Sequence, residues 1–208
     1  MTTLPEDIAA LAENIANTLT HTVYQHTDKI DPAEGVYDCD CNGFVAHVLK
    51  EVAPANLAAI PINTEQPGPS ETRPRAFEYY DFLASLTSKS TGAWSRINLL
   101  SDAGRGDVMA WRHETIKKGQ NTGHVVILAE TPRLDASGAF YVVRVYDSTE
   151  EAHFEDTRPS PKGKTGVGSG FIHFKVDGAG RPIAYLFSPP LDKQFDYLEI
   201  AIGRARAI

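Results

Sequence analysis

The stretch Asp38-Cys39-Asp40-Cys41-Asn42-Gly43-Phe44-Val45 decides the fold, because it holds both cysteines of the chain and reads as a loop that runs straight into a helix. Asp40 is a good N-cap residue, and the apolar residues after it recur at helical spacing, so we expect a helix to begin near Cys41. Cys41 stands four residues before Val45 and seven before Val48, and it therefore shares the stripe that must face the rest of the domain. The positive end of the helix stabilises a thiolate there, which is how proteins commonly make a cysteine nucleophilic.

Three other interpretations of the two cysteines compete with a reactive thiol. A free cysteine is often a small buried hydrophobic residue, but the position of Cys41 at a helix start argues against that reading. A disulfide between Cys39 and Cys41 would close too small a ring for the preferred geometry. A zinc site would need two further ligands, and the sequence has neither a second cysteine pair nor a His-x-x-x-His. We therefore expect no metal and no cofactor.

Composition sets limits on the class of protein. The chain has 208 residues, of which 42% are hydrophobic and 23% charged, so we expect one globular domain over residues 1–208. A net charge of -7 leaves no basic stripe for nucleic acid and no polybasic segment for a membrane surface. The first residues lack the basic start and apolar core of a signal peptide, which predicts a cytoplasmic protein, with export by another route left open.

The order of the elements predicts an α+β fold in which N-terminal helices pack on a mostly antiparallel sheet. Residues 5–19 have the apolar periodicity of a helix, residues 24–37 read as a loop, and the prolines between positions 54 and 74 mark an insertion-like region at about 53–105. Within that region residues 77–86 predict a short helix that covers the core. The C-terminal half is β-rich, with strands expected over 106–112, 122–128, 140–147, 171–176, 183–187 and 198–203, and with a surface loop over 157–170.

A nucleophilic cysteine needs a base within hydrogen-bond reach and a polar group that orients the base. If the strands that begin at His124 and end at Asp147 pair around a turn near residues 134–138, a symmetric register sets these two residues directly opposite one another, with Cβ atoms roughly 5 Å apart. The other residues of that face are apolar, so we expect the helix of Cys41 to cover it. A longer hairpin would put Glu150 or His153 in the place of Asp147.

The same residues resemble a family, the NlpC/P60-like cysteine peptidases of the papain-like fold. The resemblance lies in three blocks in the family's order, which are Asp40-Cys41-Asn42-Gly43-Phe44-Val45, Gly106-Asp107-Val108 and Gly123-His124-Val125-Val126-Ile127. Asn42 stands where that family usually has serine. The resemblance implies a papain-like core in which Cys41 is the nucleophile, His124 the base and Asp147 the orienting residue.

The resemblance also suggests a substrate. Members of this family commonly cut γ-D-glutamyl–diamino-acid bonds of bacterial cell-wall peptides, and a tyrosine upstream of the cysteine lines their oxyanion site. Tyr24 and Tyr37 are the candidates for that tyrosine, and we expect both, with Asp40, to contact the substrate. The predicted function is a metal-independent cysteine hydrolase that acts on a small peptide. The alternatives are a catalytically silent module that binds a peptide or small ligand, and an acyltransferase that uses the same three residues but excludes water.

Overall fold

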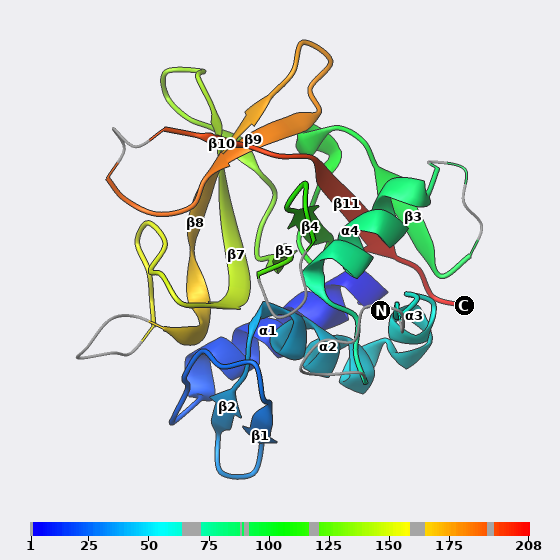
Figure 1. Cartoon of the computed structure of the whole chain (residues 1–208), viewed down its shortest axis with the longest axis vertical. Helices are drawn as coiled ribbons and strands as arrows, with labels where there is room; N and C mark the ends of the chain where they lie inside the picture. The colour runs from blue at the N-terminus through cyan, green and yellow to red at the C-terminus, as the bar shows by residue number, and fades with distance from the viewer. Residues whose placement is uncertain are drawn as a thin grey trace.

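The N-terminal helices pack against a large antiparallel β-sheet, so the predicted α+β class is confirmed (Figure 1). The computed structural model describes residues 2–63, 72–87, 89, 92–116, 121–158, 165–190 and 194–208. No helix in these ranges is long and apolar enough to cross a membrane.

The helices are α1 (Leu4–Thr18), α2 (Cys41–Val52), α3 (Pro54–Ala58) and α4 (Ala76–Ser85), with a short 3-10 turn η1 (Leu100–Asp102). Helices α1, α2 and α4 begin close to where the sequence predicts them, whereas α3 lies in the region where the sequence predicts an insertion-like loop. In α2 the side chain of Asp40 caps the first turn by accepting a hydrogen bond from the backbone N–H of Gly43 at 2.8 Å. Helix α4 lies within the region expected to be an insertion, and it packs on the sheet as predicted.

The strands form one small hairpin and one large sheet. The bounds are β1 (Lys29–Asp31), β2 (Val36–Asp38), β3 (Trp94–Ile97), β4 (Val108–Arg112), β5 (Gly123–Leu128), β6 (Arg133–Leu134), β7 (Tyr141–Thr149), β8 (Gly166–Val176), β9 (Pro182–Leu186), β10 (Asp196–Tyr197) and β11 (Ile200–Ala205). In the large sheet the order is β10-β9-β8-β7-β5-β4-β11-β3, and β6 pairs with β7. Strands β1 and β2 form a hairpin over residues 29–38, most of which lies in the segment 24–37 where the sequence predicts only a loop.

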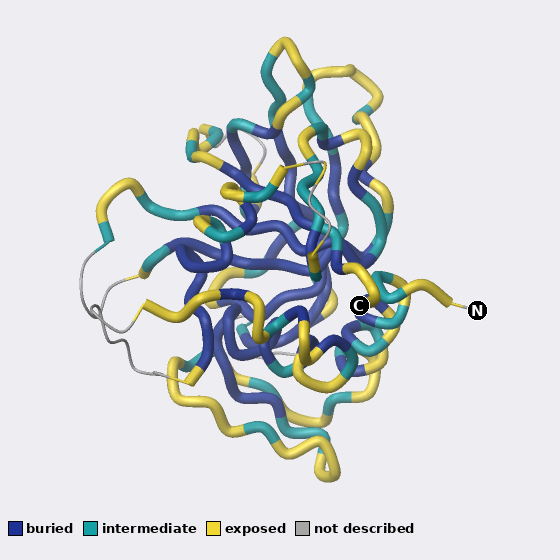
Figure 2. The backbone as a smooth tube through the Cα atoms, turned by 90° about the vertical axis from the view of Figure 1, so that its right-hand side faces the viewer, coloured by how far each residue is buried: buried dark blue, intermediate teal, exposed yellow. Residues whose placement is uncertain are grey.

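Both faces of the large sheet are buried. A helix-side cluster joins α1, α2 and α4 to one face, and its strand members include Val125 and Ile127. An enclosed cluster lies on the other face, where the sheet curls until Trp111 of β4 stacks on Tyr185 of β9 with ring centroids 4.7 Å apart. Figure 2 shows the resulting buried interior, with exposed backbone concentrated in the outer loops.

The prediction that α2 covers the face of His124 is wrong. The residues that share this face, among them Val126 and Val145, belong to the enclosed cluster, whereas α2 packs on the opposite face. Every residue of β5 is buried, so its apolar residues do not alternate with polar ones and cannot indicate which face meets the helix.

The predicted strand register is also wrong, by two residues. In β5 and β7 Ile127 pairs with Tyr146, and extending this register would set His124 opposite Thr149 instead of Asp147. The turn before β7 is also centred further along the chain than the prediction assumed, since β6 pairs Arg133 with Val142 and the carboxylate of Asp135 accepts hydrogen bonds from backbone N–H groups within the turn. A shift of two keeps Asp147 on the face of His124 because side chains alternate with a period of two.

The surface loop predicted over residues 157–170 is wrong at its C-terminal end. Strand β8 begins at Gly166, and residues 166–170 are buried in the sheet, paired with the end of β7. Its glycines at 166, 168 and 170 read as loop residues in the sequence, yet each leaves room for a neighbouring side chain. Residues 159–164 of the predicted loop lie outside the described residues.

Candidate functional site

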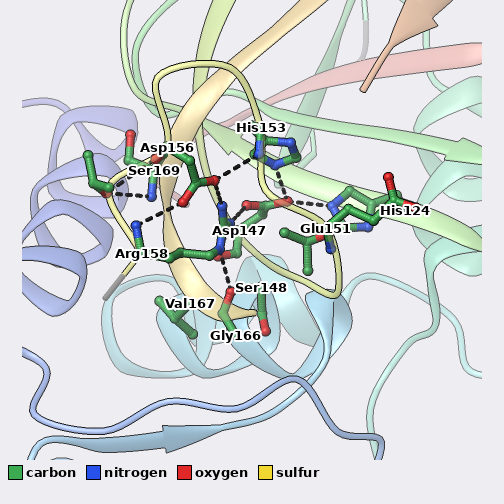
Figure 3. Close-up of polar contacts among 12 residues, drawn as sticks. His124, Asp147, Ser148, Glu151, His153, Asp156, Arg158, Gly166, Val167 and Ser169 are labelled. Carbon is green, nitrogen blue, oxygen red and sulfur yellow. Dashed lines mark hydrogen bonds and ion pairs between the residues drawn. The ribbon is translucent and has the colours of Figure 1, made fainter. Parts of the chain in front are cut away.

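Asp147 lies at the centre of the candidate site. It comes from the C-terminal part of β7 and is fully buried, and its Oδ2 accepts a hydrogen bond from Nε2 of His124 at 2.6 Å (Figure 3). His124 stands near the start of β5, beyond the two residue pairs that join β5 to β7. The structure therefore brings the predicted pair together through their side chains, across strands that have separated.

Cys41 lies close enough to His124 to act on the imidazole through a hydrogen bond and through charge. Because Asp147 binds Nε2, Nδ1 is the ring nitrogen that we assign to the Cys41 sulfur. Burial lowers the pKa of His124, but the charge of the Cys41 thiolate and the hydrogen bonds with Asp147 and Cys41 outweigh burial and raise this pKa to about 9. Because this pKa lies above 7, the imidazole of His124 is protonated at neutral pH.

The position of Cys41 follows from the way α2 starts. Helix α2 packs against both β5 and β7, and the hydroxyl of Ser148 donates a 2.6 Å hydrogen bond to the carbonyl oxygen of Cys39. This bond ties the residues just before α2 to the strand that carries Asp147. The sulfur of Cys41 also lies 3.4 Å from Oδ1 of Asn42.

Cys39 has a different environment. Both thiols are free, as expected, but Cys39 is completely buried. Burial raises the pKa of the Cys39 thiol, and the nearby carboxylates of Asp28 and Asp40 raise it further. Cys39 is therefore a poor candidate for the reactive thiol.

Two further side chains, His153 and Arg158, hold the carboxylate of Asp147. Nε2 of His153 lies 2.9 Å from Asp147 Oδ2, and the Arg158 guanidinium binds Oδ1 (Figure 3). Burial would raise the pKa of Asp147, but the charges of His153 and Arg158 and the hydrogen bond from His124 hold it well below its ordinary value. Asp147 is therefore a carboxylate at neutral pH.

Sequence reasoning missed how these two residues act. It considered His153 only as a replacement for Asp147, whereas His153 binds Asp147 in addition to His124. It gave no role to Arg158. The signal that could have found them is the alternation of glycines at 166, 168 and 170, because glycine at every second position of a strand leaves one face open to a neighbouring segment.

A cavity of about 230 Å³ lies against His124. Its walls include the aromatic rings of Trp111, Tyr185 and Phe187 from the open end of the enclosed cluster. Its described lining also includes three acidic side chains, those of Glu150, Glu151 and Asp196. The cavity can therefore hold a small group beside the imidazole.

Of the two tyrosines expected at the site, the structure brings Tyr24 to it. Tyr24 lines the cavity, and its pKa is raised by burial first and then by the charge of the Cys41 thiolate. Tyr37 is buried against the ring of His47, with centroids 5.7 Å apart, and does not line the cavity. A contact between Tyr37 and substrate stays a prediction.

Asp40 is occupied at the start of α2. Its Oδ1 accepts from Gly43 N–H and lies 2.9 Å from the guanidinium of Arg73, while its Oδ2 lies 3.2 Å from Nδ1 of His26. Burial raises the pKa of Asp40, but the hydrogen bond with His26 and the charge of Arg73 hold it below its ordinary value. Asp40 does not line the cavity, and its contact with substrate also stays a prediction.

Within the described ranges, no three His, Cys, Asp or Glu side chains are grouped so that they could hold a metal ion. No protein-family model, no curated protein and no solved structure matches this chain, so the candidate site is interpreted from its own geometry.

Proposed function

We propose that this protein is a cysteine hydrolase that cleaves an amide bond through a thioester intermediate. The observation that carries the proposal is the line of contacts from Cys41 at the start of α2, through His124, to the buried carboxylate of Asp147. A nucleophile, a base and an orienting group stand in the order that covalent acyl transfer requires.

The reaction proceeds in two halves. In the first half the Cys41 thiolate attacks the carbonyl carbon of the substrate amide, and His124 gives its proton to the leaving nitrogen as the C–N bond breaks. The amine leaves and the acyl group remains on sulfur as a thioester. In the second half His124 takes a proton from water as the hydroxide attacks the thioester carbonyl. The C–S bond then breaks and the carboxylic acid leaves, which restores the Cys41 thiolate and the protonated His124.

The oxyanion of each tetrahedral intermediate needs hydrogen-bond donors. The backbone N–H of Cys41 lies in the first turn of α2, where the N–H groups have no partner within the helix, and it is the donor we assign. The Tyr24 hydroxyl is the second donor that we assign, because Tyr24 lines the cavity beside His124.

The resemblance to NlpC/P60-like peptidases supports a papain-like core and a γ-D-glutamyl–diamino-acid peptide as substrate. The cavity has room for a small group of such a peptide beside His124, and the carboxylates of Glu150, Glu151 and Asp196 suit the second amino group of a diamino acid. Both features support the proposed substrate class.

The first test compares the two cysteines. We expect iodoacetamide at pH 6 to modify Cys41 rapidly and Cys39 hardly at all, because a thiolate alkylates and the buried thiol of Cys39 is protonated. Peptide mapping by mass spectrometry after brief treatment gives the ratio. Equal labelling of both cysteines, or faster labelling of Cys39, would contradict the proposal.

The second test measures amine release from a γ-D-glutamyl-lysine peptide. His124→Ala is expected to lower kcat/KM by about 10²- to 10⁴-fold, since general acid–base catalysis is lost. Asp147→Asn is expected to lower it by a smaller factor, because the base remains but is poorly oriented. The double variant should be little worse than His124→Ala alone.

Two controls accompany the kinetics. Circular dichroism shows whether each variant keeps its fold, and addition of a competing amine separates hydrolysis from acyl transfer through the products formed. If the effects of His124→Ala and Asp147→Asn simply multiply in folded variants, the two residues do not act as one unit and the assignment of Asp147 is wrong.

A further inference from the structure

The segment that follows β7 folds back onto the site. Residues 150–158 leave the end of β7, Phe154 forms a bridge with Phe171 of β8, and both His153 and Arg158 then reach Asp147. Figure 3 shows the Asp147 carboxylate between His124 and His153, with Arg158 on its other oxygen.

We infer that His153 is a positioning residue of the site: a second imidazole that, together with Arg158, fixes the Asp147 carboxylate so that it holds His124 in the orientation Cys41 needs. The inference rests on the proposed function, because it assigns His153 a task within the same acyl-transfer site.

The first support is the way the Asp147 carboxylate is shared. Oδ2 accepts from two imidazoles at once, from His124 at 2.6 Å and from His153 at 2.9 Å. Arg158 holds Oδ1 and also lies 3.2 Å from the backbone carbonyl oxygen of Asp147. Rotation of the carboxylate would break at least one of these contacts. The side chains of Asp147, His153 and Arg158 are all shielded from solvent.

The second support is that both the ring and the backbone N–H of His153 make further contacts with neighbouring residues. Its Nδ1 lies 3.0 Å from the carbonyl oxygen of Phe187, and its ring meets the Phe187 ring edge-on with centroids 4.4 Å apart. Its backbone N–H donates to Asp156 at 2.9 Å. Both ring nitrogens of His153 therefore have an oxygen within hydrogen-bond distance, and these two contacts fix the orientation of the ring.

The third support is the surface on which the segment lies. A Cβ at Gly170 would come 2.6 Å from the Cβ of His153, and a Cβ at Gly168 would come 2.3 Å from Cγ of Arg158. These two glycines of β8 therefore let the segment approach closely enough for both side chains to reach Asp147. The sequence of β8 is adapted to the position of His153 and Arg158.

The test uses the rate of Cys41 alkylation by iodoacetamide, which needs no substrate. At pH 6 an ordinary thiol is protonated, so a fast rate reports the thiolate that a well-held His124 stabilises. His153→Phe removes both ring donors but keeps a ring of similar size, and we expect it to slow alkylation at pH 6 by about 10- to 100-fold, since small displacements of an orienting group cost that much. His153→Gln keeps an N–H for Asp147 and should recover part of the rate.

At pH 9.5 an ordinary thiol is itself largely ionised, so the rates of these variants should approach that of the unmodified protein. This pH dependence separates positioning from a merely structural role, which would change stability without changing the ratio of the rates at the two pH values. A ratio in His153→Phe equal to that of the unmodified protein would overturn the inference.

A matched pair of glycine variants provides the same test without touching a side chain of the network. Gly170→Ala pushes on His153 and should slow alkylation at pH 6, while Gly178→Ala, where an added Cβ meets nothing within 4 Å, should not. If His153→Phe fails to fold, Gly170→Ala still decides, because it leaves every side chain of the network in place: an alkylation rate at pH 6 equal to that of the unmodified protein would refute the assignment.

The outcomes also separate this inference from the proposed function. If the unmodified protein alkylates at pH 6 no faster than an unfolded cysteine, the proposed function fails and the inference fails with it. If the unmodified protein alkylates fast, His124→Ala is slow and folded His153→Phe is fast, the proposed function survives and only the role of His153 is lost.

Discussion

Cys39 and Cys41 stand two residues apart, yet they have opposite chemical environments. Cys39 precedes α2 and is surrounded by protein and by carboxylates, which disfavour its thiolate. Cys41 begins α2, where the helix dipole favours a negative charge, and it lies beside His124. The reactivity of each cysteine is therefore decided by its neighbours: carboxylates disfavour loss of the thiol proton, and an imidazole can accept it.

The titration of His124 follows from this pairing. Its pKa of about 9 lies above the ordinary value of 6.5, so the stabilisation that its proton provides is fully present below pH 6.5 and is lost as the pH rises through about 9. The ring resonances of His124 in a ¹H–¹³C NMR titration should therefore shift near pH 9. Cys41→Ser removes the thiolate and should lower the midpoint by at least one pH unit.

The matched control is Cys39→Ser, since Cys39 does not contribute to the pKa shift of His124. It should leave the midpoint of His124 where it is. A midpoint near 6.5 in the unmodified protein would show that Cys41 and His124 do not form an ion pair.

The start of α2 depends on a charged residue that serves two elements at once. Asp40 caps the helix through Gly43 and also binds Arg73, whose guanidinium forms two further bonds with Asp28 at 2.8 and 2.9 Å. Arg73 comes from the region after α3, so Asp40 links the first turn of α2 to a segment about thirty residues away in the sequence. The position of Cys41 depends on this link.

Two substitutions of Asp40 separate the contribution of its capping hydrogen bond from that of its charge interaction with Arg73. Asp40→Asn keeps a capping oxygen for Gly43 but loses the charge that faces Arg73, and it should lower the free energy of unfolding by about 1.5 to 3 kcal/mol. Asp40→Ala also loses the cap and should cost about 1 kcal/mol more. Urea unfolding at pH 7 measures both.

The N-cap of α1 offers a control for this prediction. The Thr3 side chain accepts from Glu6 N–H at a longer 3.4 Å and has no charged partner, so Thr3→Ala should cost less than either change at Asp40. Equal losses for Asp40→Asn and Thr3→Ala would show that the bond with Arg73 contributes nothing.

The whole molecule places its core on both faces of one sheet. One face is covered by helices, and the other is enclosed because the sheet curls until β9 meets β11. The open end of this curl forms the wall of the cavity beside His124, through Trp111, Tyr185 and Phe187. The site therefore lies where the two cores meet.

This arrangement predicts that truncating a buried side chain lowers the free energy of unfolding by a similar amount on either face of the sheet. Ile127→Ala on the helix side and Leu128→Ala on the enclosed side should each lower the free energy of unfolding by about 2 to 5 kcal/mol, because both side chains are fully buried. Leu134→Ala, at a position that is 52% exposed, should change it little. A negligible effect of Leu128→Ala in thermal or urea unfolding would mean that the second face is open to solvent.

The sequence alone determined the local features of this protein. Helical spacing and the capping residue predicted α1 and the start of α2 at Cys41, strand patterns predicted most of the sheet, and the order of Cys41, His124 and Asp147 predicted the candidate site. The helices and strands depend on residues close together in the chain, where periodicity and capping act. The pairing of His124 with Asp147 depends on which face of the sheet each side chain occupies, and a register shift of two residues leaves that face unchanged.

Only the tertiary structure decided what depends on distant contacts. The face that α2 covers could not be deduced because β5 is buried on both sides, and the strand register depended on the length and centre of the turn before β7, which alternation along the strands does not reveal. The second set of partners for Asp147 was hidden for a related reason. In the sequence, His153 and Arg158 have the pattern of loop residues. They reach Asp147 because the glycines of β8 leave space for their segment, and a contact between distant segments leaves no periodic pattern in the sequence.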